Sequence, residues 1–499
     1  MTDDSLSVIG VVAQPIYRYF IIDFAKYIKR NRKGKIHLYC LNPDQVRFYE
    51  KYAPKGCFDS IESISMTSSD LISGNLDEAQ VLTEARSYEK RYGRPIHWYF
   101  LTNRHLGRGY APGGFFHPRS RQSELTTYVG AVAIQNSLFN FWEAQFAEKG
   151  IGTFFNAGFT EAAVARANGA LVRTLMPSRY ENRYFWAEDE SGGCTMLKEA
   201  YRNIFPQKES VRLESAPYGP KRARAIMAKR SSALVLFKNI FKLVKNHAYW
   251  KLKGELKGRE YFFSSMVAFR YRQWRDMKKV TGRSTKRLSD LKGKSFVFFP
   301  LQVEPEIWFQ GFSPEYFFQL SAIISLSRDL PAGVLLAVKE HLPAVGRRPT
   351  LFYEQIKELK NVVLVDAREH GLEVVRQAVA VATINSSAGQ EAAVMGKPVI
   401  SFGRHNTYNF LSHVFVVTDQ AQIQGYLSAA LNGGFDHQRA AQDGSRFLEA
   451  LKSITFDMKD LSYFTSAEDY DRNSVEGAYR KLVESVAVDM KRSNAVILN

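Results

Sequence analysis

The first 215 residues alternate between short apolar runs and longer stretches in which apolar residues recur at helical spacing. Residues 9–14 (IGVVAQ) are typical of a buried strand, and residues 17–31 follow with apolar residues on one helical face. The same order of strand and helix returns at residues 35–41 (KIHLYCL) and 43–53 (PDQVRFYEKYA). Strands that alternate with helices predict a parallel sheet with helices on both faces.

More elements are predicted before residue 215. Residues 94–102 (RPIHWYFLT) are rich in aromatic residues, so we expect a strand there. Residues 126–150 predict a long helix that ends at Gly150, and residues 160–170 predict another helix. We therefore place a first Rossmann-like domain at residues 1–215.

A second α/β pattern begins near residue 293. Apolar runs that predict strands alternate with stretches of helical spacing, and this pattern predicts a second doubly wound sheet at residues 293–437. The predicted strands lie at residues 294–302, 333–341, 361–366, 379–384, 398–403 and 413–419. Residues 438–499 predict a helical tail. The expected fold class is therefore α/β, with two Rossmann-like domains that face a cleft.

The positive charge of the chain is concentrated between these two patterns. Residues 221–290 hold 20 lysines and arginines against four acidic residues, so they supply +16 of the net charge of +18. Phe237, Phe241 and Val244 fall near one stripe of a predicted helix that also carries lysines. We expect residues 216–292 to form a basic amphipathic helical segment that contacts an anionic partner, such as a membrane surface. A linker with a solvated basic face is the other interpretation.

Composition and motifs exclude several classes of protein. Hydrophobic residues make up 45% of the chain and charged residues 24%, which is typical of a soluble globular protein. No apolar run approaches the roughly 20 residues that cross a bilayer, and the N-terminus lacks a secretory signal, so we expect a cytoplasmic protein. The three cysteines show neither metal nor disulfide spacing. We expect no metal, no cofactor and no nucleic-acid partner, because no motif for any of them occurs.

The most informative short stretch is NSSAGQE, residues 385–391, at the junction of a predicted strand and helix. A helix N-terminus presents free N–H groups that suit phosphate, and Ser386 and Ser387 add hydroxyl groups. Gly389 would let a ligand approach the backbone, and Glu391 could bind a ribose hydroxyl. The other interpretation is plain helix capping, because Ser387 and Gln390 fit the capping-box pattern.

Two further strand ends carry polar residues. Lys339 and His341 end the strand at residues 333–341, and a cation with an imidazole could hold a phosphate and leaving group. Glu304 and Glu306 follow the first strand of the second domain, where carboxylates could serve in acid–base catalysis. Each pair has a bland interpretation as well, namely surface side chains in an ordinary loop.

Weaker candidates lie in two loops. FGRHNTYNF places Arg404, His405 and Tyr408 after a predicted strand, where they could contact a base or sugar. In the first domain, residues 101–120 are rich in glycine and basic residues. The candidates in that loop are Arg104, His105, Arg108 and His117. A flexible surface loop is an equal interpretation there.

The three stronger sites, in this order and spacing, resemble the capsule polysaccharide biosynthesis family. The matching stretches are FFPLQVEPE (298–306), VKEHLP (338–343), FYEQIKELKNVVLVD (352–366) and residues 382–403 together with Tyr408. The resemblance covers about residues 293–410 and is looser over the first domain.

This resemblance implies a GT-B glycosyltransferase whose N-terminal domain holds the acceptor and whose C-terminal domain binds the nucleotide-sugar. The implied acceptor is a glycan or a lipid-linked molecule at the inner-membrane surface. It implies that His341, Ser386 and Ser387 bind the donor phosphate, with a CMP-linked acidic sugar as one donor of that kind. Lys339, Gly389, Glu391 and Tyr408 complete the expected donor site, and Glu304, Glu306 and His341 are the expected catalytic residues. Two alternatives stay open: a GT-B-like UDP-sugar epimerase, and a non-catalytic glycan-binding partner in export.

Overall fold

The computed structural model describes residues 6–32, 34–64, 76–205, 213, 225–227, 230, 232–254, 260–283, 285–304, 306, 313–316, 318–458 and 474–497. The chain forms two compact units, each built from separate stretches of sequence. Unit 1 comprises residues 1–99, 127–205 and 448–499, and unit 2 comprises residues 100–126 and 206–447. The domain boundaries expected from sequence, and the cleft, stay predictions.

Unit 1 contains a sheet of seven described strands in the order β13-β6-β5-β4-β1-β2-β3. The strands β3, β2, β1, β4 and β5 run parallel, whereas β6 and β13 pair antiparallel at one edge. Their bounds are β1 Val8–Val12, β2 Lys35–Cys40, β3 Ser60–Ser63, β4 Thr153–Phe155, β5 Leu171–Pro177, β6 Arg183–Ala187 and β13 Phe456–Asp457. The parallel part of this sheet confirms the Rossmann-like character of the N-terminal region.

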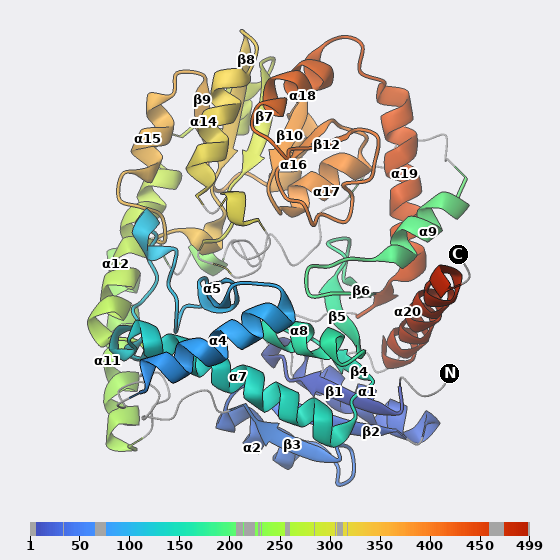
Figure 1. Cartoon of the computed structure of the whole chain (residues 1–499). Helices are drawn as coiled ribbons and strands as arrows, with labels where there is room; N and C mark the ends of the chain where they lie inside the picture. The colour runs from blue at the N-terminus through green and yellow to red at the C-terminus, as the bar shows by residue number, and fades with distance from the viewer. Residues whose placement is uncertain are drawn as a thin grey trace. The chain divides into compact units, whose positions relative to one another are not determined.

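The helices of unit 1 include one from the far end of the chain (Figure 1). Helix α20 packs on α1, β6 and β13, and Arg173, which is buried in β5, donates from Nε to the Ser485 hydroxyl at 2.9 Å. The bounds are α1 Arg18–Asn31, α2 Pro43–Tyr52, α4 Glu78–Tyr92, α5 Ile96–Phe100, α7 Tyr128–Lys149, α8 Phe159–Ala167, α9 Thr195–Asn203 and α20 Ser474–Ile497. The C-terminal helix is therefore part of the fold of the N-terminal unit.

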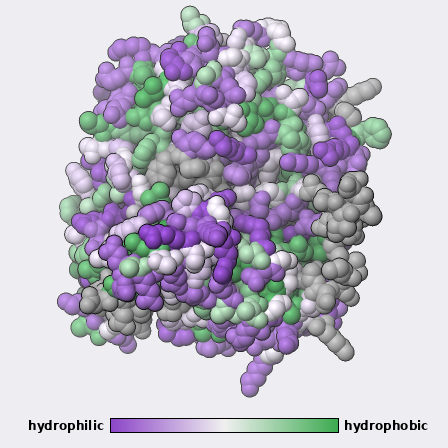
Figure 2. All heavy atoms as spheres, in the orientation of Figure 1, coloured by the Kyte–Doolittle hydropathy of each residue, from purple (hydrophilic) through white to green (hydrophobic). Residues whose placement is uncertain are grey.

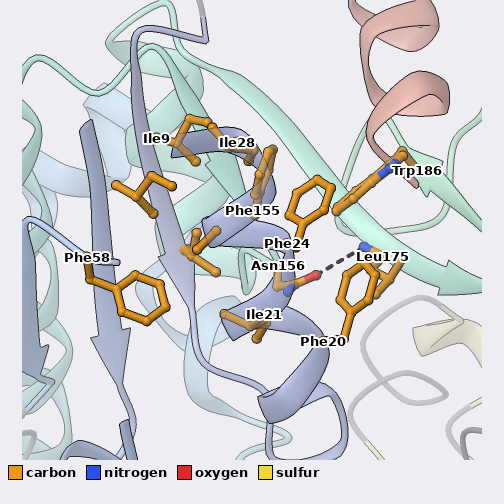
Figure 3. A pocket seen from close by; sticks show the side chains of 13 residues that line it. Ile9, Phe20, Ile21, Phe24, Ile28, Phe58, Phe155, Asn156, Leu175 and Trp186 are labelled. Carbon is orange, nitrogen blue, oxygen red and sulfur yellow. Dashed lines mark hydrogen bonds between the residues drawn. The ribbon is translucent and has the colours of Figure 1, made fainter. Parts of the chain in front are cut away.

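A small apolar pocket lies in the core of unit 1, between helix α1 and the sheet (Figure 3). Aromatic side chains from both elements, including Phe24, Phe155 and Trp186, line it. Its labelled polar side chain, Asn156, has its carboxamide oxygen bound by the backbone N–H of Leu175 at 3.0 Å. Because its polar group is already satisfied and the rest of its lining is apolar, this pocket is a packing gap in the core.

The expectation of a strand at residues 94–102 is wrong, because Ile96–Phe100 form the short helix α5. Ile96, Tyr99 and Phe100 are the buried positions, and this spacing of three and four residues is helical. Pro95 starts the turn, since the Trp98 N–H donates to its carbonyl at 3.0 Å. Aromatic content suggested a strand, but the spacing of the buried residues determined the element.

Unit 2 contains a sheet of six described strands in the order β12-β11-β10-β7-β8-β9, all parallel. Their bounds are β7 Ser295–Pro300, β8 Val334–Lys339, β9 Val362–Val365, β10 Ala380–Thr383, β11 Val399–Ser401 and β12 Val414–Val416. Counted from β7, this is the Rossmann order 3-2-1-4-5-6. All six strands were predicted, and the α/β class with two Rossmann-like sheets is confirmed.

Helices cover both faces of the second sheet. Helix α14 contacts α15 and α18, and α16 contacts α17, which indicates two separate layers (Figure 1). The bounds are α14 Gln319–Asp329, α15 Phe352–Glu358, α16 Gly371–Gln377, α17 Ser387–Val394, α18 Gln422–Leu431 and α19 His437–Ile454. The core between these layers is apolar and buried, with Phe299, Leu336 and Ile400 among its residues.

The basic segment supplies two further helices to unit 2, although parts of it lie outside the described residues. Helices α11, Ala233–Leu252, and α12, Phe263–Val280, pack against each other (Figure 1). Hydrophilic residues predominate on the molecular face seen in Figure 2, with smaller hydrophobic areas between them. In the part of the chain that the structure describes, no helix has both the length and the apolar character needed to span a membrane.

Candidate functional site

The strand order of unit 2 defines where a ligand would bind. The direction of strand succession reverses between β7 and β10, and in open α/β sheets ligands bind outside the carboxyl ends of the strands at this point. The loops that follow β7, β8 and β10 carry Glu304, His341 and Ser386 respectively. The topology therefore brings the three strand-end motifs found in the sequence to one edge of one sheet.

The loop after β10 leads into α17 through a hydroxyl cap. The Ser386 hydroxyl accepts from the Ala388 N–H at 3.0 Å, and the Thr383 hydroxyl accepts from the Ser386 N–H at 3.1 Å. Ser386 is the N-cap, so the interpretation of Ser387 as the cap residue of a box with Gln390 is wrong by one residue. As a consequence Ser387 is the first helical residue, and its side chain is exposed at the N-terminus of α17.

Gly389 is required by packing inside unit 2. A Cβ at this position would lie 2.2 Å from the Tyr408 hydroxyl and 2.5 Å from the Thr383 methyl group. Tyr408 is buried, so its ring occupies the space that the sequence suggested for a ligand. Glu391 is half-buried in the first turns of α17. Of the residues expected at this helix, Ser387 is the exposed one.

The loop after β11 is tied to the loop after β10 by the side chain of Asn406, and Asn409 closes the loop after β11 on itself. Asn406 donates from Nδ2 to the Ile384 carbonyl at 2.6 Å, and Asn409 donates to the Gly403 carbonyl at 2.8 Å. Arg404 and His405 are exposed on this loop, and Arg404 pairs with Glu315 at 2.9 Å. The pair of asparagines in NTYN could have indicated these contacts, because asparagine side chains often hydrogen-bond to nearby backbone groups.

The loops after β7 and β8 are joined by a buried ionic network centred on Arg348. Its guanidinium binds Glu340 through two N–H groups, each 2.8 Å from a carboxylate oxygen, and binds Glu304 through a third. Tyr353 of α15 donates its hydroxyl to Glu340 at 2.7 Å, and the backbone N–H of His341 donates to the same carboxylate at 2.6 Å. The side chains of Arg348, Glu340 and Glu304 are fully buried. The network fixes both loops against α15.

The two carboxyl groups of this network differ in protonation. Burial would raise the pKa of Glu340, but Arg348, together with the hydrogen bonds from Arg348 and Tyr353, holds that pKa below its ordinary value. Burial raises the pKa of Glu304 to about 8, although Arg348 acts in the opposite direction. At neutral pH Glu340 and Arg348 therefore form the ion pair, and Glu304 carries a proton.

Lys339 and His341 have different environments. Lys339 is partly buried, and burial lowers its pKa, while the carboxylates of Glu340 and Asp366 act against that change. His341 is exposed at the start of a short turn, Leu342–Ala344. Glu340, the buried residue between them, was not predicted as a site residue, because its partner Arg348 lies eight residues further along the chain.

Glu306 and several arginines lie near Arg347 in unit 2. Glu306 is half-buried and close enough to Arg347 to influence its pKa. Residues 100–126 also belong to unit 2, and they bring the candidates Arg104 and His117 to Arg347. Arg108 from the same stretch instead pairs with Glu124, and His105 lies 3.4 Å from the Tyr261 hydroxyl. Glycine-rich sequence had suggested a surface loop, but His117 is buried.

The described ranges contain no group of three or more His, Cys, Asp or Glu side chains placed to hold a metal ion. The side chains that do converge near the strand ends are hydroxyl groups, guanidinium groups and carboxyl groups. Such groups suit the binding of phosphate, carboxylate and sugar hydroxyl groups.

Comparison with known proteins gives one family. Residues 218–424 match the family model described as "Capsule polysaccharide biosynthesis protein", which confirms the resemblance expected from the sequence. The match covers the basic helices and the strand-end motifs of unit 2. A search of curated protein sequences found no match.

The solved structures to which this chain is similar include transferases and an epimerase. The beta Kdo 2,7 transferase of Thermosulfurimonas dismutans KpsC is 14% identical, with 69% of this chain and 88% of that chain covered and a TM-score of 0.29. The beta Kdo 2,4 transferase of the same protein is 12% identical, with 59% and 80% covered and a TM-score of 0.30. The UDP-GlcNAc 2-epimerase of Methanocaldococcus jannaschii is 9% identical, with 89% and 99% covered and a TM-score of 0.29.

The protonated state of Glu304 predicts a specific dependence of stability on pH. Its pKa rises from an ordinary value of 4.5 to about 8 on folding, so the native state binds the proton more tightly than the unfolded state. The contribution of this proton is fully present below about pH 4.5 and is lost as the pH rises towards 8. In Glu304→Gln, whose side chain is neutral at every pH, the free energy of unfolding should lose this decline between about pH 5 and 8.

Denaturant unfolding of both proteins at pH 5, 6.5 and 8 measures this effect. Glu304→Gln should equal or exceed the unaltered protein in stability at pH 8. The opposite result would be that Glu304→Gln is less stable than the unaltered protein and that this difference is larger at pH 8 than at pH 5. Glu304 would then be ionised in the folded state, and the assignment of the proton would be wrong.

Proposed function

We propose that this protein is a glycosyltransferase of capsule or surface polysaccharide biosynthesis, which transfers a sugar from a nucleotide-sugar to a glycan or lipid-linked acceptor. The observation that carries the proposal is the position of the strand-end motifs. Ser387, at the start of α17, and His341, in the loop after β8, are exposed beside the point where the Rossmann strand order reverses. The family match over residues 218–424 supports the biological context.

The site supports distinct roles for its residues. The N-terminus of α17 and the Ser387 hydroxyl would bind the donor phosphate, and His341 would stabilise the leaving nucleotide as the glycosidic bond breaks. Lys339 and Glu391 stay proposed as supporting donor contacts. Glu306, half-buried beside an arginine, is the proposed base that accepts the proton of the acceptor hydroxyl.

Three residues proposed from sequence fit a positioning role better than direct contact. Glu304 is fully buried in the Arg348 network, and Tyr408 is buried against Gly389. Ser386 caps α17 with its hydroxyl and so orients the helix that carries Ser387. We propose that these residues hold the strand-end loops in place.

The proposed transferase and the two alternative functions differ in the nucleotide and acceptor that they require. His341 is followed by Leu342, with Pro343 one residue later, so a CMP-linked acidic sugar is one donor among several. A UDP-sugar epimerase would convert its substrate without any acceptor. A non-catalytic glycan-binding partner in export would need no nucleotide at all.

The double substitution Ser387→Ala with His341→Ala tests the phosphate site. Each change removes an exposed group that would bind donor phosphate, so nucleotide affinity should fall at least about 10-fold. Melting of the unliganded protein should change little, because both side chains are exposed. Titration calorimetry with the nucleotide that binds the unaltered protein measures the affinity.

Ser386→Ala provides a contrasting variant: loss of this cap should lower the free energy of unfolding by about 1 kcal/mol, whereas the double substitution should leave it nearly unchanged. Nucleotide affinity that is the same in the double variant and in the unaltered protein would rule out Ser387 and His341 as phosphate ligands.

Features of α11, in the basic segment, support the proposal that this protein contacts an anionic membrane surface. On α11 the stripe formed by Leu234, Phe237, Phe241 and Val244 is exposed, with Phe237 and Phe241 each about 70% accessible. Lysines lie beside this stripe, and the helix contains no acidic residue. A helix with an exposed aromatic stripe and flanking lysines is suited to lie in the interface of an anionic bilayer. The opposite face of α11 packs on α12.

Phe237→Ser with Phe241→Ser should release the protein from vesicles that contain anionic phospholipid. Each phenylalanine that enters a bilayer contributes roughly 1.5–3 kcal/mol, so the partition coefficient should fall about 100-fold or more. Vesicle flotation measures it, and Phe205→Ser, which removes an exposed aromatic ring elsewhere, is the control.

Equal flotation of the double variant and the unaltered protein would exclude α11 as the membrane contact. A change of oligomeric state with no change in flotation would show that the stripe binds a second copy of the chain instead.

A further inference from the structure

Arginine side chains gather beside the strand-end site of unit 2, at a place that the proposed donor contacts do not include. Arg347 lies in the loop after β8, directly before the buried Arg348. Its backbone carbonyl accepts from the Phe116 N–H at 2.7 Å, which ties this loop to residues 100–126. Arg104 and Arg230 lie close enough to Arg347 for their positive charges to lower its pKa.

Arg347 itself has buried hydrogen-bond donors without partners. Among the described residues, neither Nε nor Nη1 of its guanidinium has an acceptor, and both atoms are buried. The guanidinium carbon lies 5.6 Å from the centre of the Phe269 ring. Stacking on an aromatic face leaves the N–H groups in the guanidinium plane unused, so this contact does not satisfy them.

The charge around Arg347 is unbalanced. Burial, followed by the charge of Arg104, lowers the pKa of Arg347 to about 10, and Glu306 is the acidic neighbour that opposes this change. Burial likewise lowers the pKa of Arg230 to about 10, with Arg270 adding to the effect.

The nearby acidic and imidazole groups do not correct this imbalance. Glu340, which acts on Arg230, is already bound to Arg348. His117 adds no counter-charge, because burial and then Arg104 lower its pKa to about 3 and leave it neutral. A half-buried guanidinium with buried N–H groups that lack acceptors, as in Arg347, is costly in a folded protein.

We propose that Arg104, Arg230 and Arg347 form an oxyanion subsite of unit 2, with Arg347 as its central ligand. The subsite binds a phosphate or carboxylate group, whose oxygens accept from the unsatisfied N–H groups of Arg347 and offset the surplus positive charge. Its position follows from the loop after β8, which also carries His341. The identity of the natural ligand rests on the proposed function: a phosphate of the nucleotide donor, or the carboxylate of an acidic sugar.

Arg347→Gln tests the subsite, because glutamine keeps much of the side-chain volume and removes the charge. The unaltered protein should bind inorganic pyrophosphate or glucuronate saturably in titration calorimetry, and Arg347→Gln should weaken that binding at least 10-fold. Without an anion, the melting temperature of Arg347→Gln should equal or exceed that of the unaltered protein, because an uncompensated buried charge is gone. Arg328→Gln, at an exposed arginine paired with Asp329, is the control and should bind normally.

The two probes separate the two sources of an oxyanion. Binding of pyrophosphate that depends on Arg347 assigns the subsite to phosphate, and binding of glucuronate that depends on Arg347 assigns it to a sugar carboxylate. The proposal is overturned if the unaltered protein binds neither probe, or if Arg347→Gln binds them as tightly. It is also overturned if Arg347→Gln melts well below the unaltered protein without an anion, because the guanidinium would then be a structural group. Arg347-dependent binding in a protein that binds no nucleotide would keep the subsite and remove the proposed transferase.

Discussion

The guanidinium of Arg348, held between two buried carboxyl groups, is the constraint on which the candidate site depends. It connects the loop after β7 to the loop after β8, and through Glu340 it reaches the Tyr353 hydroxyl on α15. Removing one partner of such a network would leave a buried charge uncompensated, which costs roughly 3–5 kcal/mol. The exposed His341 and the half-buried Arg347 are both attached to this framework by the backbone, so their positions follow from it.

Around this framework, some polar side chains of unit 2 bind the backbone of the loops, and others are exposed to solvent. Ser386, Asn406 and Asn409 use their side chains on backbone groups of the same loops. Ser387 and His341 are exposed at the same edge of the sheet. The division is what a binding site requires, because a ligand is held well only when the groups that contact it are fixed by others.

The sequence predicted the sheets better than the site. Strands of unit 2 were found because continuous apolar runs are typical of strands buried on both faces. The strand expected at residues 94–102 was wrong, because aromatic content was weighed above the helical spacing of Ile96, Tyr99 and Phe100. The helix cap was missed by one residue, since two adjacent serines fit the same position and only backbone geometry separates them.

Long-range partnerships account for the rest of what the sequence could not predict. Nothing near Glu304 in the chain indicates that Arg348 hydrogen-bonds to it, and nothing near Gly389 indicates that Tyr408 fills the space beside it. Nothing near Phe116 in the chain indicates that its backbone N–H binds the carbonyl of Arg347. Local patterns specify elements, but pairings between distant loops decide which polar residues remain open to a ligand.

The most direct test of the account is a calorimetric titration of the unaltered protein with CMP, UDP and GDP, followed by the sugar adduct of whichever nucleotide binds. The account predicts saturable binding of one nucleotide, with one site per chain, at the carboxyl edge of the second sheet. CMP would indicate an acidic-sugar donor, and UDP or GDP a neutral sugar or amino sugar. Binding of none of the three would contradict the transferase, and the N-terminus of α17 would then be a capped helix end without a donor site.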